Sequence, residues 1–495
     1  MEQKPLKICY VASEVEPFAK TGGLADVAGS LPAALKERNL DIRMMMPKYK
    51  SINDRKFVLR EVIRLSEANV ELGGVSRVAS GKTAFLPNSK VHVYFLSFPE
   101  FFNRRSLYVD PETGKDFADN AERFAYFSKS VLETLKLLYW QPDIIHCNDW
   151  QTALIPYYLK THYQDDPFFQ GMRTLLTIHN VAFQGVFPLG IGKKIGIDAS
   201  LLEKGQPFYF HGKLNFLKGG IHYADLLSTV SPTYAREICE DESIGAGLSD
   251  VLKARQTDLT GILNGADYNV WSPEKDRFIP HNYDLENLDK KIENKKALCE
   301  QFGLDFKAET PLLGLVTRLT EQKGMPLLLK AMNGLLKEKI QLVILGVGDP
   351  EIQQKLKELA AKNSSRMAFQ ARFDNRTAHL IEAGSDILLM PSRFEPCGLN
   401  QIYSLRYGTI PLVHQTGGLA DTVIDVQTSP EKGNGFVFKE FTPAMFLKTV
   451  EAAIATFRDT DKWREIQRRA VTAVFSWEKS AREYAKLYEK VAAGR

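Results

Sequence analysis

Glycine residues that could bind an anionic ligand recur at two places in the chain. The six residues Thr-Gly-Gly-Leu-Ala-Asp occur at 21–26 and again at 416–421. Each copy follows an apolar run that predicts a buried strand, at 6–12 and at 409–414, and each precedes a helical pattern. Such a turn leaves backbone N–H groups pointing outward without intrahelical partners, and the helix dipole adds partial positive charge. Because glycine also permits close approach, both turns suit phosphate oxygens, unless glycine serves only packing there.

Three cations lie on predicted strand-end loops. Lys20 directly precedes the first copy, whereas Arg318 ends the predicted strand 312–318 and Lys323 follows it by five residues on the same loop. Two cations on one strand-end loop can bind a diphosphate through charge-assisted hydrogen bonds, each worth roughly 1.5–3 kcal/mol. The alternative is an ordinary solvated loop. The chain contains no G-x-x-x-x-G-K-[ST] phosphate loop, and Gly-Val-Gly-Asp-Pro at 346–350 lacks the full G-x-G-x-x-G dinucleotide pattern.

A carboxylate marks a second strand-end loop. Glu395 lies between the predicted strand 386–391 and a helix that we expect to begin near Gly398. A charge at this junction is either a helix-start residue favoured by the dipole or a ligand contact. Cys397 has no general base nearby in the sequence, so we interpret it as a packed thiol and not as a nucleophile.

Polar residues also follow two strands of the first half. Asp149 and His179 come just after or at the end of the predicted strands 143–147 and 173–179. A lone histidine is more often structural, but ligands of open α/β sheets bind at the carboxyl ends of strands, which favours a functional role here. The acidic residues show no D-x-D motif after a strand. We therefore predict no metal site, with phosphate charge met by Lys, Arg and backbone dipoles.

Strand-like and helix-like runs alternate through both halves of the chain. Residues 1–265 form one series, the polar, Pro-bearing stretch 266–310 leads to a second, and the second has apolar runs at βαβ spacing (312–318, 341–346, 366–371, 386–391 and 409–414). Near-continuous apolar runs are typical of parallel strands that helices cover on both faces. A final helix from about Trp477 presents an apolar face made of Tyr484, Leu487, Tyr488 and Val491. This alternation predicts an α/β protein of two domains.

Composition excludes several classes of protein. The net charge is only +4 over 495 residues, which argues against a nucleic-acid-binding surface as the main feature. No run approaches the ~20 apolar residues of a membrane span, and the N-terminal apolar segment is too short for a signal peptide. Five cysteines without a C-x-x-C pair indicate a reducing cytoplasm, with neither a zinc site nor a disulfide framework.

Taken in series, these motifs resemble those of bacterial glycogen synthases and plant starch synthases, which are glycosyltransferases of the GT-B architecture. The matching motifs are, in order, KTGGLADV, HCNDW, TIHN, ILNGAD, TRLTEQKG, EPCGLNQ and the second TGGLADTV. They cover nearly the whole chain. The resemblance implies two Rossmann-like domains with parallel sheets facing a central cleft. The first is 1–265 joined by the C-terminal helix 477–495, and the second, 266–476, binds the nucleotide sugar.

The resemblance implies transfer of glucose from ADP-glucose to the non-reducing 4-OH of an α-1,4-glucan, with retention and release of ADP. It implies no cofactor, and neither nucleic acid nor membrane as a partner. It leaves the oligomeric state open. Two alternatives stay open: a glucosyltransferase of the same fold that uses UDP-glucose or a small acceptor, and a non-catalytic glucan-binding protein.

The resemblance also implies roles for individual residues. Glu395 faces the donor glucose, His179 contacts the transferred glucose with Asp149 nearby, and Arg318 and Lys323 stabilise the departing ADP. The remaining predicted substrate-binding residues lie near the phosphates, glucose or adenine and are Lys20, Gly22, Gly23, Asn264, Phe373, Cys397, Gly398, Leu399, Thr416, Gly417 and Gly418. The chain departs from the commoner family spelling in having Asn148 and Asn400 where histidine and threonine are frequent, and His414 where arginine often appears. The expected route is front-face transfer, in which the diphosphate takes the acceptor's proton, with double displacement through Glu395 as the rival.

Overall fold

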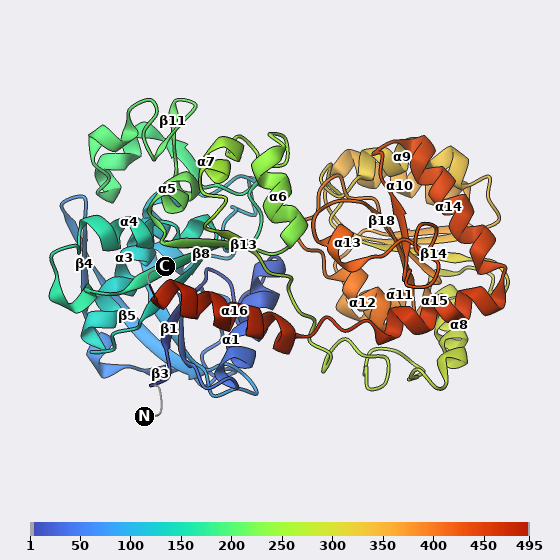
Figure 1. The fold of residues 1–495 in the computed structure, drawn as a ribbon, viewed down its shortest axis with the longest axis horizontal. Coiled ribbons are helices and arrows are strands. Elements are labelled where there is room, and N and C mark those ends of the chain that lie inside the picture. The colour runs from blue at the N-terminus through green and yellow to red at the C-terminus, as the bar shows by residue number, and fades with distance from the viewer. Residues whose placement is uncertain (1–3, 494–495) are drawn as a thin grey trace. The chain divides into compact units, whose positions relative to one another are not determined.

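The computed structural model describes residues 4–493, which form two compact units. Unit 1 contains the described parts of Met1–Val230, Ala235–Gly265 and Trp477–Arg495. Unit 2 contains Ser231–Tyr234 and Ala266–Ser476. Each unit has its own sheet flanked by helices (Figure 1). This arrangement confirms the predicted α/β class.

Unit 1 is built on a ten-stranded sheet. Its parallel part runs in the order β13 (Leu259–Gly261), β12 (Leu226–Thr229), β8 (Arg173–Ile178), β7 (Ile144–Asn148), β1 (Lys7–Val11), β2 (Asp41–Pro47) and β6 (His92–Ser97). Antiparallel strands β5 (Val75–Phe85), β3 (Arg60–Glu61) and β4 (Ala68–Leu72) extend it beyond β6. A separate small sheet contains β10 (Tyr209–Phe210), β11 (Lys213–Asn215) and β9 (Val186–Pro188).

Unit 1 contains eight α-helices among its described residues, one of which begins in unit 2. They are α1 (Gly23–Lys36), α2 (Pro99–Phe102), α3 (Asn120–Leu137), α4 (Leu154–Thr161), α5 (Phe216–Tyr223), α7 (Ser249–Ala254) and α16 (Trp477–Ala492), together with α6 (Pro232–Glu240), which begins in unit 2. The last helix, α16, packs against α1 and contacts β7 and β8 (Figure 1). Its buried residues include Tyr484, Leu487, Tyr488 and Val491, which confirms the predicted apolar face.

Unit 2 has a six-stranded, wholly parallel sheet in the order β16 (Met367–Gln370), β15 (Gln341–Leu345), β14 (Leu312–Val316), β17 (Ile387–Met390), β18 (Ile410–His414) and β19 (Phe436–Phe438). Its helices are α8 (Lys291–Phe302), α9 (Met325–Leu335), α10 (Pro350–Lys362), α11 (Asn375–Gly384), α12 (Asn400–Arg406), α13 (Gly417–Thr422), α14 (Pro443–Phe457) and α15 (Thr460–Thr472).

Alternate residues of the unit 2 strands enter two different hydrophobic clusters. In β15, Leu342 and Ile344 belong to one cluster while Val343 and Leu345 belong to the other. Because side chains alternate between the faces of a strand, a strand covered on both faces must be apolar throughout. This explains why the buried strands read as continuous apolar runs in the sequence.

Both sheets share one order of strands. When the parallel strands are ranked along the chain, unit 2 reads 3-2-1-4-5-6, which is the order of doubly wound nucleotide-binding folds, and unit 1 reads the same order with a seventh strand, β13, at the end. The order reverses between β1 and β7 in unit 1, and between β14 and β17 in unit 2. Loops at the carboxyl ends of these strands are therefore the expected places for a ligand.

A few element boundaries differ from expectation. The helix expected near Gly398 begins at Asn400, because Gly398 has a left-handed backbone with φ of 71°. The polar stretch 266–310, read as an approach segment, contains α8, whose apolar face is narrow. Within residues 4–493, no helix is both long and apolar enough to cross a membrane.

Candidate active site

The point where the order of strands reverses in unit 2 brings together a lysine and a glutamate that are 72 residues apart. Lys323, on the loop after β14, places Nζ 2.5 Å from Oε2 of Glu395, on the loop after β17. Ser392 Oγ donates to the same oxygen at 3.0 Å. Glu395 is only 5% exposed, so the lysine neutralises a carboxylate that has little contact with water. The two predicted residues therefore form one ion pair, which their positions in the sequence did not indicate.

The second Gly-Gly pair packs directly against the Glu395 loop. A Cβ on Gly417 would lie 1.9 Å from the Glu395 carbonyl oxygen, and one on Gly418 would lie 2.1 Å from the Cys397 carbonyl oxygen. Gly418 N also donates to the Glu395 carbonyl at 3.1 Å. Glycine is required here so that α13 can approach the loop that carries the carboxylate.

The other predicted residues of this loop region shape the two helix starts. Cys397 is buried, as expected of a packed thiol. Gly398 has a positive φ, and a Cβ there would meet the Gln401 side chain. Leu399 is the N-cap residue of α12, and Thr416 is the buried N-cap residue of α13. These positions set backbone direction around Glu395.

Arg318 and Phe373 are the exposed members of the predicted set in unit 2. In the described chain, the Arg318 guanidinium makes no hydrogen bond or ion pair with another residue. Phe373 follows β16 and is 84% exposed, with the ion pair of Arg372 and Asp374 on either side of it in the chain. Both side chains can therefore contact a ligand without breaking a contact within the protein.

In unit 1 the first Gly-Gly turn differs physically from the second. A Cβ on Gly22 or Gly23 would meet no atom within 4 Å, and neither residue has a positive φ. Neither packing nor a positive φ therefore requires glycine at these two positions. Lys20, beside the turn, pairs with Asp26 at 2.6 Å.

The backbone N–H groups of the two turns are not all open, so this part of the prediction is wrong. The buried carboxylate of Glu14 accepts hydrogen bonds from the N–H groups of Thr21 and Gly22, from Thr21 Oγ1 and from the Tyr108 hydroxyl. At the second turn, Gly418 donates to the Glu395 carbonyl. Sequence reasoning missed Glu14, although a carboxylate six residues before Lys20 was a visible signal.

Asp149 and His179 lie together at the carboxyl ends of the neighbouring strands β7 and β8. The His179 N–H donates to Asp149 Oδ1 at 2.7 Å. Asp149 has φ of 56° and ψ of −176°, a region that is strained for any residue with a side chain and costs roughly 1–3 kcal/mol. Such strain is typical of functional sites.

The electrostatics of this pair follow from burial. Burial raises the pKa of Asp149 to about 7, against the opposing effect of the backbone hydrogen bonds from His179 and Asn180. Burial also lowers the pKa of His179 to about 3. The imidazole is therefore neutral at physiological pH and can act as a hydrogen-bonding group, not as a cation.

Asn264 lies on the loop after β13 and is buried. Its Oδ1 has no hydrogen-bond partner within residues 4–493. In unit 1, Lys20, Asp149, His179 and Asn264 thus follow β1, β7, β8 and β13 respectively, all at the carboxyl ends of parallel strands. Direct hydrogen bonding joins only Asp149 and His179 of these four in the described contacts.

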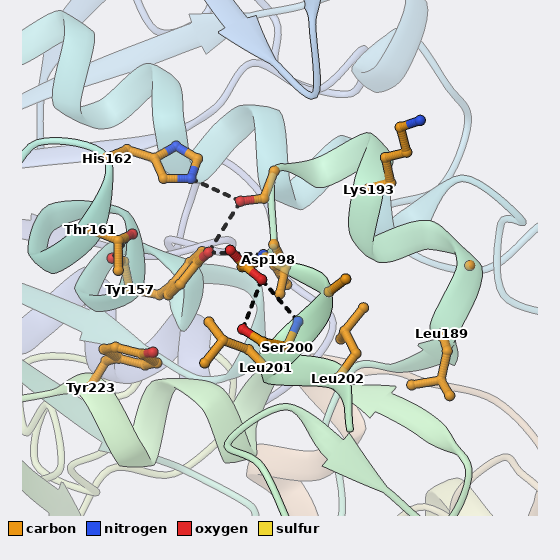
Figure 2. Close-up of a pocket in the computed structure, with 14 residues that line it drawn as sticks. Tyr157, Thr161, His162, Leu189, Lys193, Asp198, Ser200, Leu201, Leu202 and Tyr223 are labelled. Atoms are coloured by element: carbon orange, nitrogen blue, oxygen red, sulfur yellow. Dashed lines mark hydrogen bonds between the residues drawn. The ribbon is translucent and has the colours of Figure 1, made fainter. Parts of the chain in front are cut away.

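A cavity of about 740 Å³ lies elsewhere in unit 1 (Figure 2). Its lining includes Tyr157, His162, Asp198 and Tyr223, and none of the predicted site residues. Figure 2 shows Asp198 accepting hydrogen bonds from Ser200 N and Oγ, at 2.9 and 2.8 Å. This cavity is separate from the predicted site. No cluster of His, Cys, Asp and Glu within the described part of the chain has the grouping of a metal site.

Comparisons with known proteins match both halves of the chain. Residues 7–254 match the family model for the starch synthase catalytic domain, and residues 300–470 match that for glycosyl transferases group 1. The glycogen synthase of Syntrophotalea carbinolica is 41% identical over 98% of this chain and 99% of its own length. The glycogen synthase of Thermotoga maritima is 43% identical over 99% of each chain.

A solved structure supports the same assignment. The catalytic domain of starch synthase IV from Arabidopsis thaliana, bound to ADP and acarbose, matches with a TM-score of 0.89 and 32% identity over 99% of this chain and all of that one. A sucrose-phosphate synthase from Thermosynechococcus elongatus, at 17% identity and a TM-score of 0.61, shares the fold. The fold, the order of the motifs and the full-length similarity together show that this chain is a glycosyltransferase of GT-B architecture and belongs to the family of glycogen and starch synthases.

Proposed function

We propose that this chain transfers glucose from ADP-glucose to the non-reducing 4-OH of an α-1,4-glucan such as glycogen, with retention at the anomeric carbon and release of ADP. The observation that carries the proposal is the Lys323–Glu395 pair at the strand-order reversal of unit 2, with the unpartnered guanidinium of Arg318 on the same loop as Lys323. The ADP bound to the starch synthase IV catalytic domain supports the choice of nucleotide.

Lys323 and Arg318 have the charge that the leaving group requires. When the bond between glucose and phosphate breaks, negative charge develops on the departing ADP. Two cations fixed on one loop stabilise that charge more in the transition state than in the bound donor. The open Gly22–Gly23 turn offers a further place for close approach of the donor phosphates.

We propose that Glu395 binds the sugar and does not attack it. Lys323 and Ser392 both contact its Oε2, so the negative charge is already compensated. A compensated carboxylate is a weaker nucleophile, and this supports front-face transfer, in which the diphosphate takes the acceptor's proton. A glucosyl adduct trapped on Glu395 during slow turnover, and found by mass spectrometry of peptides, would establish double displacement instead.

A direct assay measures ADP release and glucan elongation with ADP-glucose or UDP-glucose, each with and without glycogen. We expect ADP release that depends on glycogen, with ADP-glucose used at least tenfold better than UDP-glucose, which corresponds to about 1.4 kcal/mol. No nucleotide release under any condition would instead favour a glucan-binding protein. If the protein used UDP-glucose efficiently and ADP-glucose not at all, its donor would be UDP-glucose and not the proposed ADP-glucose.

We further propose a cytoplasmic location. All five cysteines lie within the described residues and none forms a disulfide. Disulfide-free cysteines are usual in the reducing cytoplasm, where a sugar nucleotide is also available. Fractionation of the native cells with an antibody against the chain would test this location.

A further inference from the structure

Asn148 ends β7 and is completely buried, with every polar atom of its side chain in use. Its Nδ2 lies 2.9 Å from the Val11 carbonyl oxygen and 3.4 Å from the His146 carbonyl oxygen. Its Oδ1 lies 3.1 Å from the Tyr10 hydroxyl and 2.9 Å from His179 Nε2. The side chain therefore links β1, the end of β7 and the histidine that follows β8.

The two backbone carbonyls determine which way the amide points. A carbonyl oxygen only accepts hydrogen bonds, so the group facing Val11 O and His146 O must be the NH₂ group. The amide oxygen is thereby directed at His179, and an amide oxygen only accepts. His179 Nε2 must then carry the proton. Since the imidazole is buried and neutral, its Nδ1 is left with a lone pair.

From this geometry we infer that Asn148 is a positioning residue that holds His179 in the Nε2–H tautomer and thereby presents Nδ1 as a hydrogen-bond acceptor. An acceptor nitrogen suits a hydroxyl group of the transferred sugar, which can donate its proton to it. This inference rests on the proposed function, in which His179 contacts the glucose.

The tautomer can be measured without any turnover. The full-length protein is labelled with ¹⁵N at its histidines, and long-range ¹H–¹⁵N correlation spectra identify the protonated nitrogen of each ring, with His179 assigned from its absence in His179→Ala. We expect the Nε2–H form in the wild type. An Nδ1–H form in the wild type would overturn the inference, whatever the enzyme's activity.

Variants at position 148 test whether Asn148 fixes the tautomer of His179. Asn148→Leu removes the acceptor, so we expect a mixture of tautomers and kcat lower by roughly 10- to 100-fold, with KM for ADP-glucose and inhibition by ADP changed less than about threefold. Asn148→His can donate to Val11 O through one nitrogen and accept from His179 through the other, so it should keep the tautomer and most of kcat. A retained Nε2–H tautomer and full kcat in Asn148→Leu would refute the inference.

Two controls separate positioning from folding. Tyr10→Phe removes the other donor to Asn148 Oδ1 but leaves the amide oriented by Val11, so the tautomer should not change. Asn294→Leu removes an equally buried asparagine whose side chain, within residues 4–493, is hydrogen-bonded to the backbone of His281. If Asn148→Leu fails to fold, the wild-type, Tyr10→Phe and Asn148→His spectra still decide the tautomer. A wild type that is inactive with every donor would contradict the proposed function, whereas the tautomer measurement would stand.

Discussion

At the scale of single residues, Lys323 and Glu395 depend on one another. Each neutralises the other in a place with little water, so removing one leaves an uncompensated charge on its partner. Ser392 adds one hydrogen bond to the carboxylate but no charge. The pair is therefore both a structural contact and the proposed site of leaving-group stabilisation.

Lys323→Ala should lower kcat by roughly 100- to 1000-fold, because a fixed positive charge is missing when ADP departs. The buried Glu395 also loses its cation, so thermal unfolding should begin at a lower temperature. Steady-state kinetics and differential scanning calorimetry measure the two effects. Lys330→Ala, which changes an exposed lysine on α9, is the matched control and should change neither. Turnover of Lys323→Ala equal to wild type would show that the leaving-group role is wrong.

His146 makes stability depend on pH in a predictable direction. Burial lowers its pKa from 6.5 to about 3, while its ring contacts the Tyr488 hydroxyl and Thr177 Oγ1. Between these values the unfolded chain binds a proton that the folded chain does not. Stability is thus complete above pH 6.5 and falls as the pH is lowered, by about 1.4 kcal/mol per unit for this one group.

The replacement His146→Gln removes this titration. We expect the free energy of unfolding of the wild type to fall more steeply from pH 6.5 to pH 5 than that of the variant. The two slopes should differ by up to about 1.4 kcal/mol per pH unit, which corresponds to the uptake of one proton. Urea unfolding at several pH values provides the measurement. His179 and Asp149 titrate in both proteins and cancel in the comparison. Parallel pH dependences in the two proteins would contradict the assignment.

At the scale of elements, the two copies of the repeated hexapeptide occupy different positions in the fold. The first copy follows β1, the first-ranked strand of unit 1, whereas the second follows β18, the fifth-ranked strand of unit 2. The loop equivalent to the first copy in unit 2 is the one after β14, which carries Arg318 and Lys323. Identical residues therefore do not occupy equivalent places in the fold.

The aspartates that end the two copies also have different partners. Asp26 of the first copy pairs with Lys20. Asp421 of the second accepts hydrogen bonds from Ser231 Oγ, Thr233 N and Thr233 Oγ1. The first copy is arranged around an open turn, and the second joins segments within unit 2.

Alanine substitutions should separate these roles. Gly22→Ala should leave the free energy of unfolding within about 0.5 kcal/mol of wild type, since no protein atom is near, and should raise KM for ADP-glucose. Gly417→Ala should destabilise by at least about 1–3 kcal/mol, because φ is 43° and the new Cβ would meet the Glu395 carbonyl. Chemical denaturation and donor kinetics on both variants test the contrast. Equal losses of stability would show that the first turn also serves packing.

At the scale of the whole molecule, helix α16 belongs with unit 1, although most of unit 2 lies between them in the chain. Helix α16 buries its apolar face in unit 1, and Tyr488 reaches the buried His146 at 2.7 Å. Ser480 Oγ donates to the Leu263 carbonyl at 2.6 Å. The core of unit 1 therefore requires helix α16, which follows unit 2 in the chain.

Adjacent residues of α16 allow a matched test of this dependence. Leu487 is 5% exposed, so Leu487→Ala should cost about 2–5 kcal/mol of unfolding free energy through lost burial and a cavity. Lys486 is exposed and pairs only with Glu483, so Lys486→Ala should cost less than about 0.5 kcal/mol. Urea denaturation compares the two. Similar costs would mean that α16 does not contribute to the core of unit 1.

The sequence by itself determined what depends on local pattern. Continuous apolar runs at βαβ spacing were sufficient to predict parallel sheets, since only strands covered on both faces must be apolar throughout. The apolar stripe of α16 was visible for the same reason. Ordered motifs were sufficient to recognise the family. Helix α8, within the polar stretch 266–310, was missed because the apolar face of this helix is too narrow to show in the sequence.

Only the tertiary structure decided what depends on contacts between distant residues. The pairing of Lys323 with Glu395, the carboxylate of Glu14 beneath the first turn and the amide of Asn148 at His179 all join segments that no periodicity connects. The order of the strands likewise shows that the two identical glycine turns are not equivalent. Periodicity reports which face of an element is buried, whereas hydrogen bonds and charges act only between atoms that the completed fold has brought within about 3 Å of each other.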